Sequence, residues 1–232
     1  MIDLHTHIIP NIDDGSRSVE DSIRIAREAK ENGFSAIFCT SHYLEHSYNV
    51  EKEENDKLFN ELKKQLDIDI YSGNEIYISP NILECIEEGK VQTLNDSKYI
   101  LTELPMENSV PYLKDVIFKL VSKGYIPIIA HPERYQFVQK DYKSLIELTK
   151  MGVLFQMNYG SIVGVYGRKA KKSAKILLKN DLIHFLGTDT HRADFIYNDI
   201  EKIKKKITKI IGEEKFIELS ETNARPIIES IV

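Results

Sequence analysis

The sequence is poor in cysteine, has no long apolar run and carries no strong excess of charge of either sign. Its two cysteines cannot form a disulfide framework, so we expect a protein of the reducing cytoplasm. A net charge of −5 gives no sign of a basic surface for nucleic acid. No apolar stretch reaches the roughly 18 residues of a membrane span, and the first residues lack the basic and apolar regions of a signal peptide. We therefore expect a protein that is not embedded in a membrane.

Short β-rich runs alternate with segments of helical periodicity along the chain, without a linker or low-complexity segment. Strand, helix, glycine and strand recur at a spacing of about thirty residues, which indicates βα units and a parallel sheet. Seven strands favour a closed or nearly closed (β/α) barrel, and a doubly wound open sheet is the structural alternative. A length of 232 residues fits one such domain, spanning 1–232. The predicted strands are Met1–His5, Phe34–Cys39, Ile68–Tyr71, Tyr99–Leu101, Ile126–Ala130, Val153–Met157 and Ile183–Leu186.

Local signals predict several helix ends. Ser18 is the expected N-cap of the first helix, and Pro111 is expected in the first turn of a later one. The stretch Lys202–Lys209 combines lysines with an isoleucine stripe, which predicts a solvated surface helix rather than a nucleic-acid or membrane patch. A residue in the left-handed backbone conformation ends a helix at low cost, and Asn180 is expected to adopt it before the last strand. The glycines expected to do the same are Gly33, Gly124 and Gly152.

Polar side chains lie at the end of nearly every predicted strand, where a βα barrel gathers its functional groups. His5 and His7 are two residues apart, so a strand would point both side chains to one face. Imidazole nitrogen and carboxylate oxygen together suit Mn, Fe or Zn, whereas an all-oxygen site suits Mg or Ca. Because the candidates exceed the four ligands of one closed zinc site, we expect two or three clustered ions, and Asp14 in the first βα loop could add a carboxylate. The candidate ligands are His5, His7, His42, Glu75, His131, Asp189 and His191.

Taken singly, each of these residues is a weak signal, because His42 or His131 alone would more often be a hydrogen-bonded core histidine. Three other histidine or glutamate residues are expected to lie outside the ligand set. Glu103 ends a predicted strand without a second supporting feature, His46 sits in a polar loop, and His184 lies inside the last strand. The joint pattern of histidines and carboxylates at successive strand ends is therefore what predicts a metal site.

Six motifs at these strand ends also resemble a known family. They are Met1–His7, Asp13–Ser16, Thr40–His42, Gly73–Tyr77, Ala130–Tyr135 and Thr188–His191. Together they resemble the polymerase-and-histidinol-phosphatase (PHP) superfamily and, within it, the CpsB/CapC family of bacterial protein-tyrosine phosphatases. The resemblance implies a distorted seven-stranded (β/α) barrel with a manganese-preferring cluster of two or three ions, for which Fe or Zn would also be compatible. It implies hydrolysis of phosphotyrosine, typically on the tail of a tyrosine kinase that controls capsule or exopolysaccharide synthesis.

The resemblance further implies a role for each site residue. His5, His7, Glu75 and Asp189 would surround one ion. Glu75 would bridge to a second ion held by His42 and His131, and a third would be held by Asp14 and His191. Arg134 matches the arginine of the family's phosphate site. Relatives tend to carry another arginine several residues after the Asp-x-His motif, whereas here Arg192 follows at once and is the candidate for that second phosphate contact.

A hydrolytic mechanism is expected from these parts. Clustered metals would lower the pKa of a bridging water, whose hydroxide would attack phosphorus in line. Arg134 would stabilise charge on the non-transferred oxygens, unless it forms an ion pair with Glu133 or another acid. Asp189 or a nearby histidine could assist proton transfer to the leaving oxygen. A cysteine-dependent mechanism needs Cys-x5-Arg, but Glu45 and Val91 occupy the arginine positions after the two cysteines.

Three other functions stay open on the sequence alone. The same ligands could serve a phosphoesterase acting on a small metabolite such as histidinol phosphate or a nucleotide, and a deep pocket would favour that substrate over a protein tail. They could also serve a nuclease acting on nucleic-acid ends, although the pI of about 5.9 counts against it. The third alternative is a non-catalytic metal-binding or scaffold protein. The sequence leaves the oligomeric state undetermined.

Overall fold

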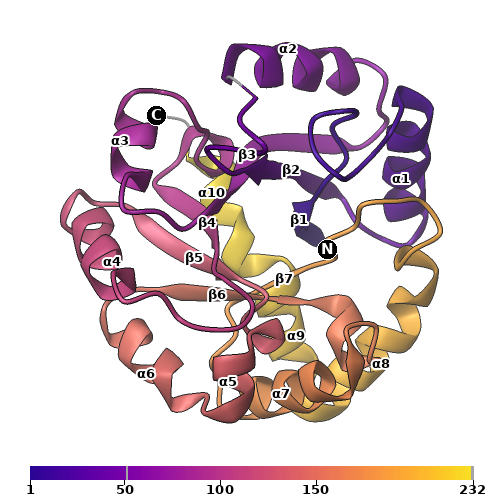
Figure 1. The fold of residues 1–232 in the computed structure, drawn as a ribbon. Coiled ribbons are helices and arrows are strands. Elements are labelled where there is room, and N and C mark those ends of the chain that lie inside the picture. Colours follow the sequence, from indigo (N-terminus) through magenta and orange to yellow (C-terminus); the bar gives the residue numbers. More distant parts are fainter. Residues whose placement is uncertain (51, 231–232) are drawn as a thin grey trace.

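Seven parallel strands curl into a nearly closed barrel in a computed structural model that describes residues 1–50 and 52–230 (Figure 1). Each strand pairs with the next in chain order. A parallel bridge between Thr6 and Thr190 then links the segment after the last strand to the first strand. A doubly wound sheet would reverse its strand order near the middle, so the sequential order and this closure confirm the barrel. The strands are β1 (Ile2–Thr6), β2 (Ala36–Tyr43), β3 (Asp69–Tyr77), β4 (Tyr99–Glu103), β5 (Ile126–Ala130), β6 (Leu154–Asn158) and β7 (Phe185–Gly187).

Most helices ring the sheet on its outer side, whereas α10 lies near the middle of the ring in this view (Figure 1). None of the helices within residues 1–50 and 52–230 is both long and apolar enough to cross a membrane. Short 3-10 turns connect several elements: η1 (Leu94–Asp96), η2 (Pro132–Arg134), η3 (Tyr159–Ile162), η4 (Tyr197–Asp199) and η5 (Thr222–Ala224). The α-helices are α1 (Val19–Glu31), α2 (Lys52–Lys63), α3 (Ile82–Glu87), α4 (Leu113–Ser122), α5 (Gln136–Lys140), α6 (Lys143–Lys150), α7 (Gly167–Lys179), α8 (Ile200–Ile211), α9 (Glu213–Ser220) and α10 (Arg225–Glu229).

Two apolar clusters explain why the site forms at one end of the barrel. The larger cluster packs the helices against the outside of the sheet. The smaller one fills the barrel interior with side chains such as Phe38 and Leu101, together with Ile227 of α10. Because alternate strand residues share a face, Phe38 and His42 both point inward along β2, and so do Leu101 and Glu103 along β4. Apolar side chains therefore fill one end of the barrel and polar side chains line the other.

The helix ends mostly follow the sequence predictions. Ser18 caps α1 by accepting a hydrogen bond from the backbone N–H of Asp21, and the three predicted glycines have φ between 85° and 92°. The prediction for Asn180 is wrong: its φ is −98°, and Asp181 takes the left-handed conformation instead, with φ of 54°. Pro111 also lies outside its helix, because α4 begins at Leu113. The lysine-rich stretch forms α8, which buries Ile203 and Ile207 of the predicted apolar stripe.

The strands differ from prediction where the polar residues begin. β2 continues to Tyr43 and β3 to Tyr77, so Thr40–His42 and Ser72–Glu75 lie within strands rather than after them. Apolar periodicity fails there because these inner positions line a polar site, while the backbone ladder between β2 and β3 continues from Ala36 to Tyr43. β1 ends at Thr6, so His7 lies just beyond its strand.

Candidate metal centre

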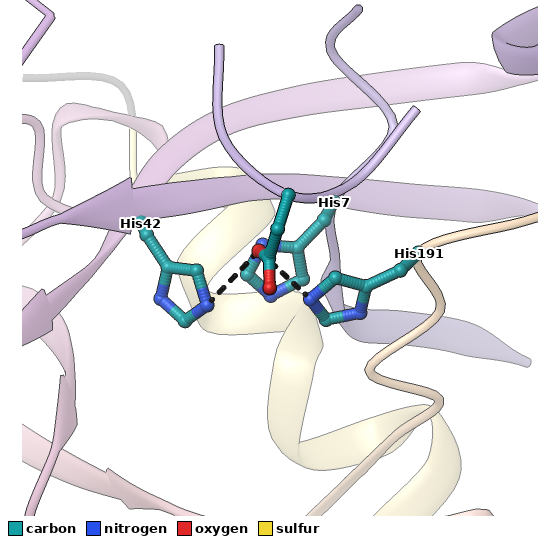
Figure 2. A group of neighbouring side chains, drawn as sticks. His7, His42 and His191 are labelled. Atoms are coloured by element: carbon teal, nitrogen blue, oxygen red, sulfur yellow. Dashed lines mark ion pairs between the residues drawn. The ribbon is translucent and has the colours of Figure 1, made fainter. Parts of the chain in front are cut away.

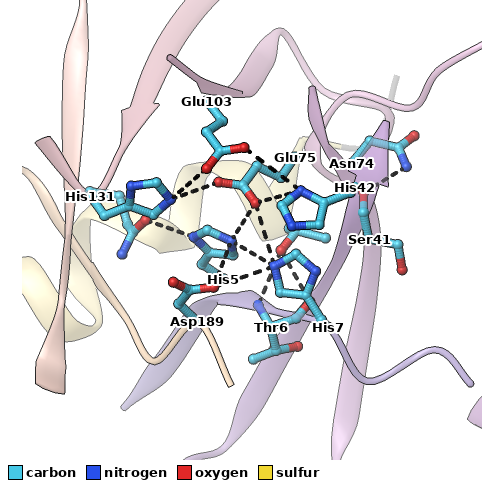
Figure 3. Close-up of polar contacts among 12 residues, drawn as sticks. His5, Thr6, His7, Ser41, His42, Asn74, Glu75, Glu103, His131 and Asp189 are labelled. Atoms are coloured by element: carbon cyan, nitrogen blue, oxygen red, sulfur yellow. Dashed lines mark hydrogen bonds and ion pairs between the residues drawn. The ribbon is translucent and has the colours of Figure 1, made fainter. Parts of the chain in front are cut away.

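The polar end of the barrel brings histidines and carboxylates from widely separated segments into one buried cluster (Figure 3). Glu75 lies at its centre, with Oε2 3.1 Å from Nε2 of His5 and 3.1 Å from Nδ1 of His42. The other oxygen, Oε1, is 3.0 Å from Nε2 of His131. The Nε2 atoms of His5 and His7 are themselves 3.0 Å apart. One carboxylate is thus surrounded by four imidazoles.

Two further carboxylates extend the cluster in opposite directions. Oδ1 of Asp189 is 3.6 Å from Nε2 of His5 and 3.5 Å from Nε2 of His7. On the other side, Oδ1 of Asp14 is 3.4 Å from Nε2 of His191 and 3.6 Å from Nε2 of His42 (Figure 2). Metal bonds of roughly 2.0–2.2 Å place ligand atoms at about these separations, so both groups are spaced to hold an ion. All eight ligand residues expected from the sequence converge here.

Glu103 also faces the cluster, although its sequence context did not predict a ligand role. Its Oε1 is 3.6 Å from Nε2 of His131, and its Oε2 is 4.0 Å from Nδ1 of His42. Burial and the nearby charge of Glu75 raise the pKa of Glu103 to about 8, as expected where two carboxylates crowd a position that suits a cation. Its place at the end of β4, on the inner face, is the signal that could have identified it.

Hydrogen bonds from outside the cluster fix the orientation of the histidine rings. Oε1 of Gln156 lies 2.9 Å from Nδ1 of His5, and Oδ2 of Asp13 lies 2.8 Å from Nδ1 of His7. The carbonyl of Asp189 is 3.0 Å from Nδ1 of His191. In each case the contact leaves Nε2 pointing into the cluster, the arrangement by which outer partners hold metal-binding imidazoles.

Arg134 is paired with Asp189 rather than with its chain neighbour Glu133. Its Nη1 donates to Oδ2 of Asp189 at 2.6 Å, and Nδ2 of Asn158 donates to the same oxygen at 2.8 Å. The guanidinium also stacks on Tyr166, 4.6 Å from the ring centre. Glu133 instead accepts hydrogen bonds from the N–H of Asn158 and from the side chain of Ser161. The fork of Arg134 is therefore held in place with most of its donors still free.

The electrostatics of the cluster fit a bound cation. Burial alone would raise the pKa of Glu75, but the charge of His5 and the hydrogen bond from His131 hold it well below its ordinary value. Burial would lower the pKa of His7, yet Asp13, Asp189 and Glu75 raise it well above its usual range. Oε2 of Glu75 is buried without a hydrogen-bond donor. A buried anion with an unfilled acceptor and converging imidazole nitrogens is the donor set of a transition-metal site.

Burial favours the neutral form of three other histidines of the cluster. It lowers the pKa of His131 to about 4, with help from the positive charge of Arg134, and it also lowers the pKa of His42 and His191. Neutral imidazole is the form that ligates a metal, because protonation removes the nitrogen lone pair. Asp189 is the opposite case. Burial opposes ionisation, but His5 and Arg134 are among the groups that hold its pKa well below the usual range, which favours a ligand over a proton donor.

Two of the ligand residues have a strained backbone. His131 has φ of 34° and Asp189 has φ of 55°, both in the left-handed region that non-glycine residues rarely adopt. Such strain costs about 1–3 kcal/mol per residue and persists at sites where function requires it. The backbone at Gly187 packs tightly against His5, since a Cβ on Gly187 would lie 2.7 Å from Cβ of His5. The packing is therefore arranged around the cluster.

A cavity of about 520 Å³ opens from the cluster to the surface. Arg134, Tyr166, Arg192 and Phe195 line it together with the metal-site carboxylates and histidines. Arg192 is exposed beside this cavity. A phosphate contact requires this location, and the contact itself stays a prediction. Phe195 is 40% exposed. Neither Tyr166 nor Phe195 was identified from the sequence, because no motif separates them from core aromatics.

The remaining histidines and both cysteines lie outside the cluster. His46 is exposed in its loop, and Nδ1 of His184 accepts a hydrogen bond from the N–H of Phe155, as expected of a packing residue. Cys39 and Cys85 are buried, and burial raises the pKa of the Cys39 thiol well above its usual value. No reactive thiolate is expected from such a position.

The cysteine positions give a direct prediction. The double variant Cys39→Ala, Cys85→Ala should keep the turnover of the parent protein, because neither sulfur lines the cavity. Steady-state hydrolysis of p-nitrophenyl phosphate, with circular dichroism as a folding check, measures this. A folded variant without turnover would contradict a metal-dependent mechanism.

Comparisons with known proteins agree with this geometry. The profile of the family described as "Capsular polysaccharide synthesis, CpsB/CapC" matches residues 1–229. The tyrosine-protein phosphatase CpsB of Streptococcus pneumoniae is 34% identical over 238 residues, covering 98% of both chains. The tyrosine-protein phosphatase YwqE of Bacillus subtilis is 35% identical over 196 residues, which cover 82% of this chain and 77% of the relative. A solved structure described under "YwqE from Bacillus subtilis and CpsB from Streptococcus pneumoniae, unique metal-dependent tyrosine phosphatases" superposes with a TM-score of 0.88 at 31% identity, covering 100% of this chain and 96% of the other.

Proposed function

The chain belongs to the CpsB/CapC family, as its motifs predicted, and from this premise we propose that it is a metal-dependent protein-tyrosine phosphatase. Its curated relatives are tyrosine-protein phosphatases, so it is a hydrolase of phosphoric monoesters. The observation that carries the proposal is the position of Arg134, held against Asp189 at the rim of a cluster of imidazoles and carboxylates. Such a site can bind a phosphoryl group through its metal ions together with a guanidinium.

We propose three ligand sets within the cluster. The first consists of His5, His7, Glu75 and Asp189, as the family resemblance implied. Glu75 is shared with a second set, and there the geometry suggests a change: Glu103 joins His131 in place of His42. The reason is that a neutral imidazole offers one lone pair, and Nε2 of His42 faces Asp14 beside His191. Asp14, His42 and His191 then form the third set. Mixed nitrogen and oxygen donors support manganese, with iron or zinc as alternatives.

Each residue around the phosphoryl group has a distinct task in this proposal. When bound, the metal ions supply an activated water and neutralise charge on the phosphoryl oxygens. Arg134 donates its free N–H groups to those oxygens, and stacking on Tyr166 keeps its plane fixed. Asp189 stays ionised and ties Arg134 to the first ligand set. Arg192 supplies a second positive charge at the mouth of the cavity.

The substrate we propose is phosphotyrosine on a protein, most simply the tail of a tyrosine kinase that controls capsule or exopolysaccharide synthesis. The description of the family supports the link to capsule synthesis. Exposed Phe195 at the cavity rim supports an aromatic leaving group, because ring pairs add about 0.5–1.5 kcal/mol beyond burial. Tyrosinate, a phenolate anion, is also a fairly good leaving group, so strong general-acid catalysis is not required.

A substrate panel tests this function. The protein is stripped of metal with a chelator, reloaded with Mn²⁺, and assayed on a phosphotyrosine peptide, a phosphoserine peptide, histidinol phosphate and DNA ends. We expect activity to disappear on stripping, to return with Mn²⁺, and to be greatest on the phosphotyrosine peptide. Equal or faster turnover of histidinol phosphate would reject the tyrosine-phosphatase function, and activity that survives stripping would reject the metal.

A further inference from the structure

Residues of α5 and α7 line a second cleft, of about 470 Å³. The two helices lie next to each other in Figure 1. The lining of the cleft contains three lysines, Lys140, Lys169 and Lys172, together with glutamine, serine and apolar side chains, and it contains no aspartate or glutamate. All three lysines are exposed. Among residues 1–50 and 52–230, no carboxylate forms an ion pair with any of them. The cleft is therefore a cavity with an uncompensated positive charge on a protein whose net charge is −5.

The charge of α7 is unfavourable for the helix that carries it. The helix has no acidic residue in its first turn, where Arg168 and Lys169 instead meet the positive end of the helix dipole. Lysines continue along α7 to Lys179 without an acidic residue between them. The lysine-rich α8 differs, because Lys202 and Lys204 pair with Asp199 and Glu213. Positive charge at a helix N-terminus, with no acidic residue to balance it, is typical of a functional surface.

The cleft and the cavity of the metal centre are lined by residues that lie close together in the same two segments of the chain. Tyr166 lines the cavity and Lys169, one helical turn later, lines the cleft. On the α5 side, Gln139 lines the cleft and donates hydrogen bonds to the carbonyls of Glu133 at 2.9 Å and Arg134 at 3.1 Å. Lys169 and Lys172 lie about 5–9 Å along the helix from Tyr166. An extended peptide covers that length in about two or three residues.

We propose that this cleft docks an acidic stretch of the phosphotyrosine protein, with aspartate or glutamate about two to four residues from the phosphotyrosine. The inference rests on the proposed phosphatase function and adds a sequence preference to it. A polypeptide is the occupant that fits, because it can enter the cavity with its phosphotyrosine and continue over Tyr166 into the second cleft. Opposite charge at the rim of an interface favours the right partner and speeds its association.

The test compares two phosphotyrosine peptides that differ only at those positions, one with Asp and Glu and one with Ser and Asn. The Mn²⁺-loaded protein should hydrolyse the acidic peptide with a roughly three- to tenfold lower KM, since each exposed charge pair contributes about 0.2–1 kcal/mol. The preference should shrink as NaCl is added. In Lys169→Ala, Lys172→Ala it should disappear. The matched control Lys205→Ala, Lys206→Ala removes two exposed lysines of α8 and should keep it.

Each other outcome overturns the inference. Equal KM values for the two peptides, or an equal loss in the α8 control, would mean that the cleft does not recognise acidic peptide. A parallel loss of p-nitrophenyl phosphate hydrolysis in the α7 variant would show that the two lysines support the metal centre rather than peptide recognition, which also overturns the inference. If the α7 variant keeps the peptide preference but loses binding to anionic vesicles or to an RNA oligonucleotide, the partner is of that other class. Failure of the phosphatase function is distinguishable, because neither peptide would then be hydrolysed, while fluorescence anisotropy of the unphosphorylated acidic peptide would still report docking.

Discussion

Glu75→Gln is expected to lose activity and bound metal together, with kcat falling more than 100-fold. Glu75 is fully buried, and its two oxygens face His5, His42 and His131 at 3.0–3.1 Å. The amide keeps the shape of the side chain but removes the charge and one acceptor, so two ligand sets would lose their shared anion. Changing partners outside a metal site already costs about 10–100-fold, and a shared ligand should cost more.

The measurement is metal content by inductively coupled plasma mass spectrometry, alongside turnover of p-nitrophenyl phosphate. Glu147→Gln is the control, since Glu147 is an exposed residue of α6 that forms an ion pair with surface Lys114, far from the ligand residues in the sequence. It should retain both metal and turnover. A Glu75→Gln protein with full metal content would show that the ligand sets are assigned wrongly, whatever its activity.

The barrel could be predicted because each βα unit repeats its own local signals. Apolar runs, glycine at helix ends and a strand spacing of about thirty residues do not depend on distant contacts. The predicted ends of β2 and β3 were wrong for a physical reason. Inner residues such as His42 and Glu75 are polar because they line the site, so the apolar pattern stops before the strand does.

The ligand candidates could be predicted from position, but their pairing could not. Histidines at strand ends identify which residues meet, whereas the facing of each ring depends on side-chain contacts between strands. His42 shows this, because its two nitrogens face Glu75 and Asp14 from opposite edges. The contact between Gln156 and His5 could not be predicted for the same reason, since it joins β6 to β1. Glu103 was set aside because a lone glutamate at a strand end has no distinguishing neighbour in the sequence.

Arg134→Lys is the second prediction with a large effect, and it separates phosphate binding from metal binding. Lysine can still place one positive charge near Asp189, but it lacks the planar fork and stacks less well on Tyr166. Removing one preorganised donor from the transition state typically costs about 10²–10³-fold. We therefore expect kcat/KM on a phosphotyrosine peptide to fall by about that factor.

Metal content should stay unchanged in Arg134→Lys, because Oδ2 of Asp189 still accepts from Asn158 and Oδ1 still faces His5 and His7. This contrast with Glu75→Gln is the decisive readout. Arg192→Lys is the matched control and should change kcat/KM only a few-fold, since Arg192 is exposed at the cavity mouth and no described residue holds its guanidinium. Loss of metal in Arg134→Lys would mean that Arg134 acts chiefly by holding Asp189 in the first ligand set. Full activity would mean that the metals alone stabilise the charge on the phosphoryl oxygens.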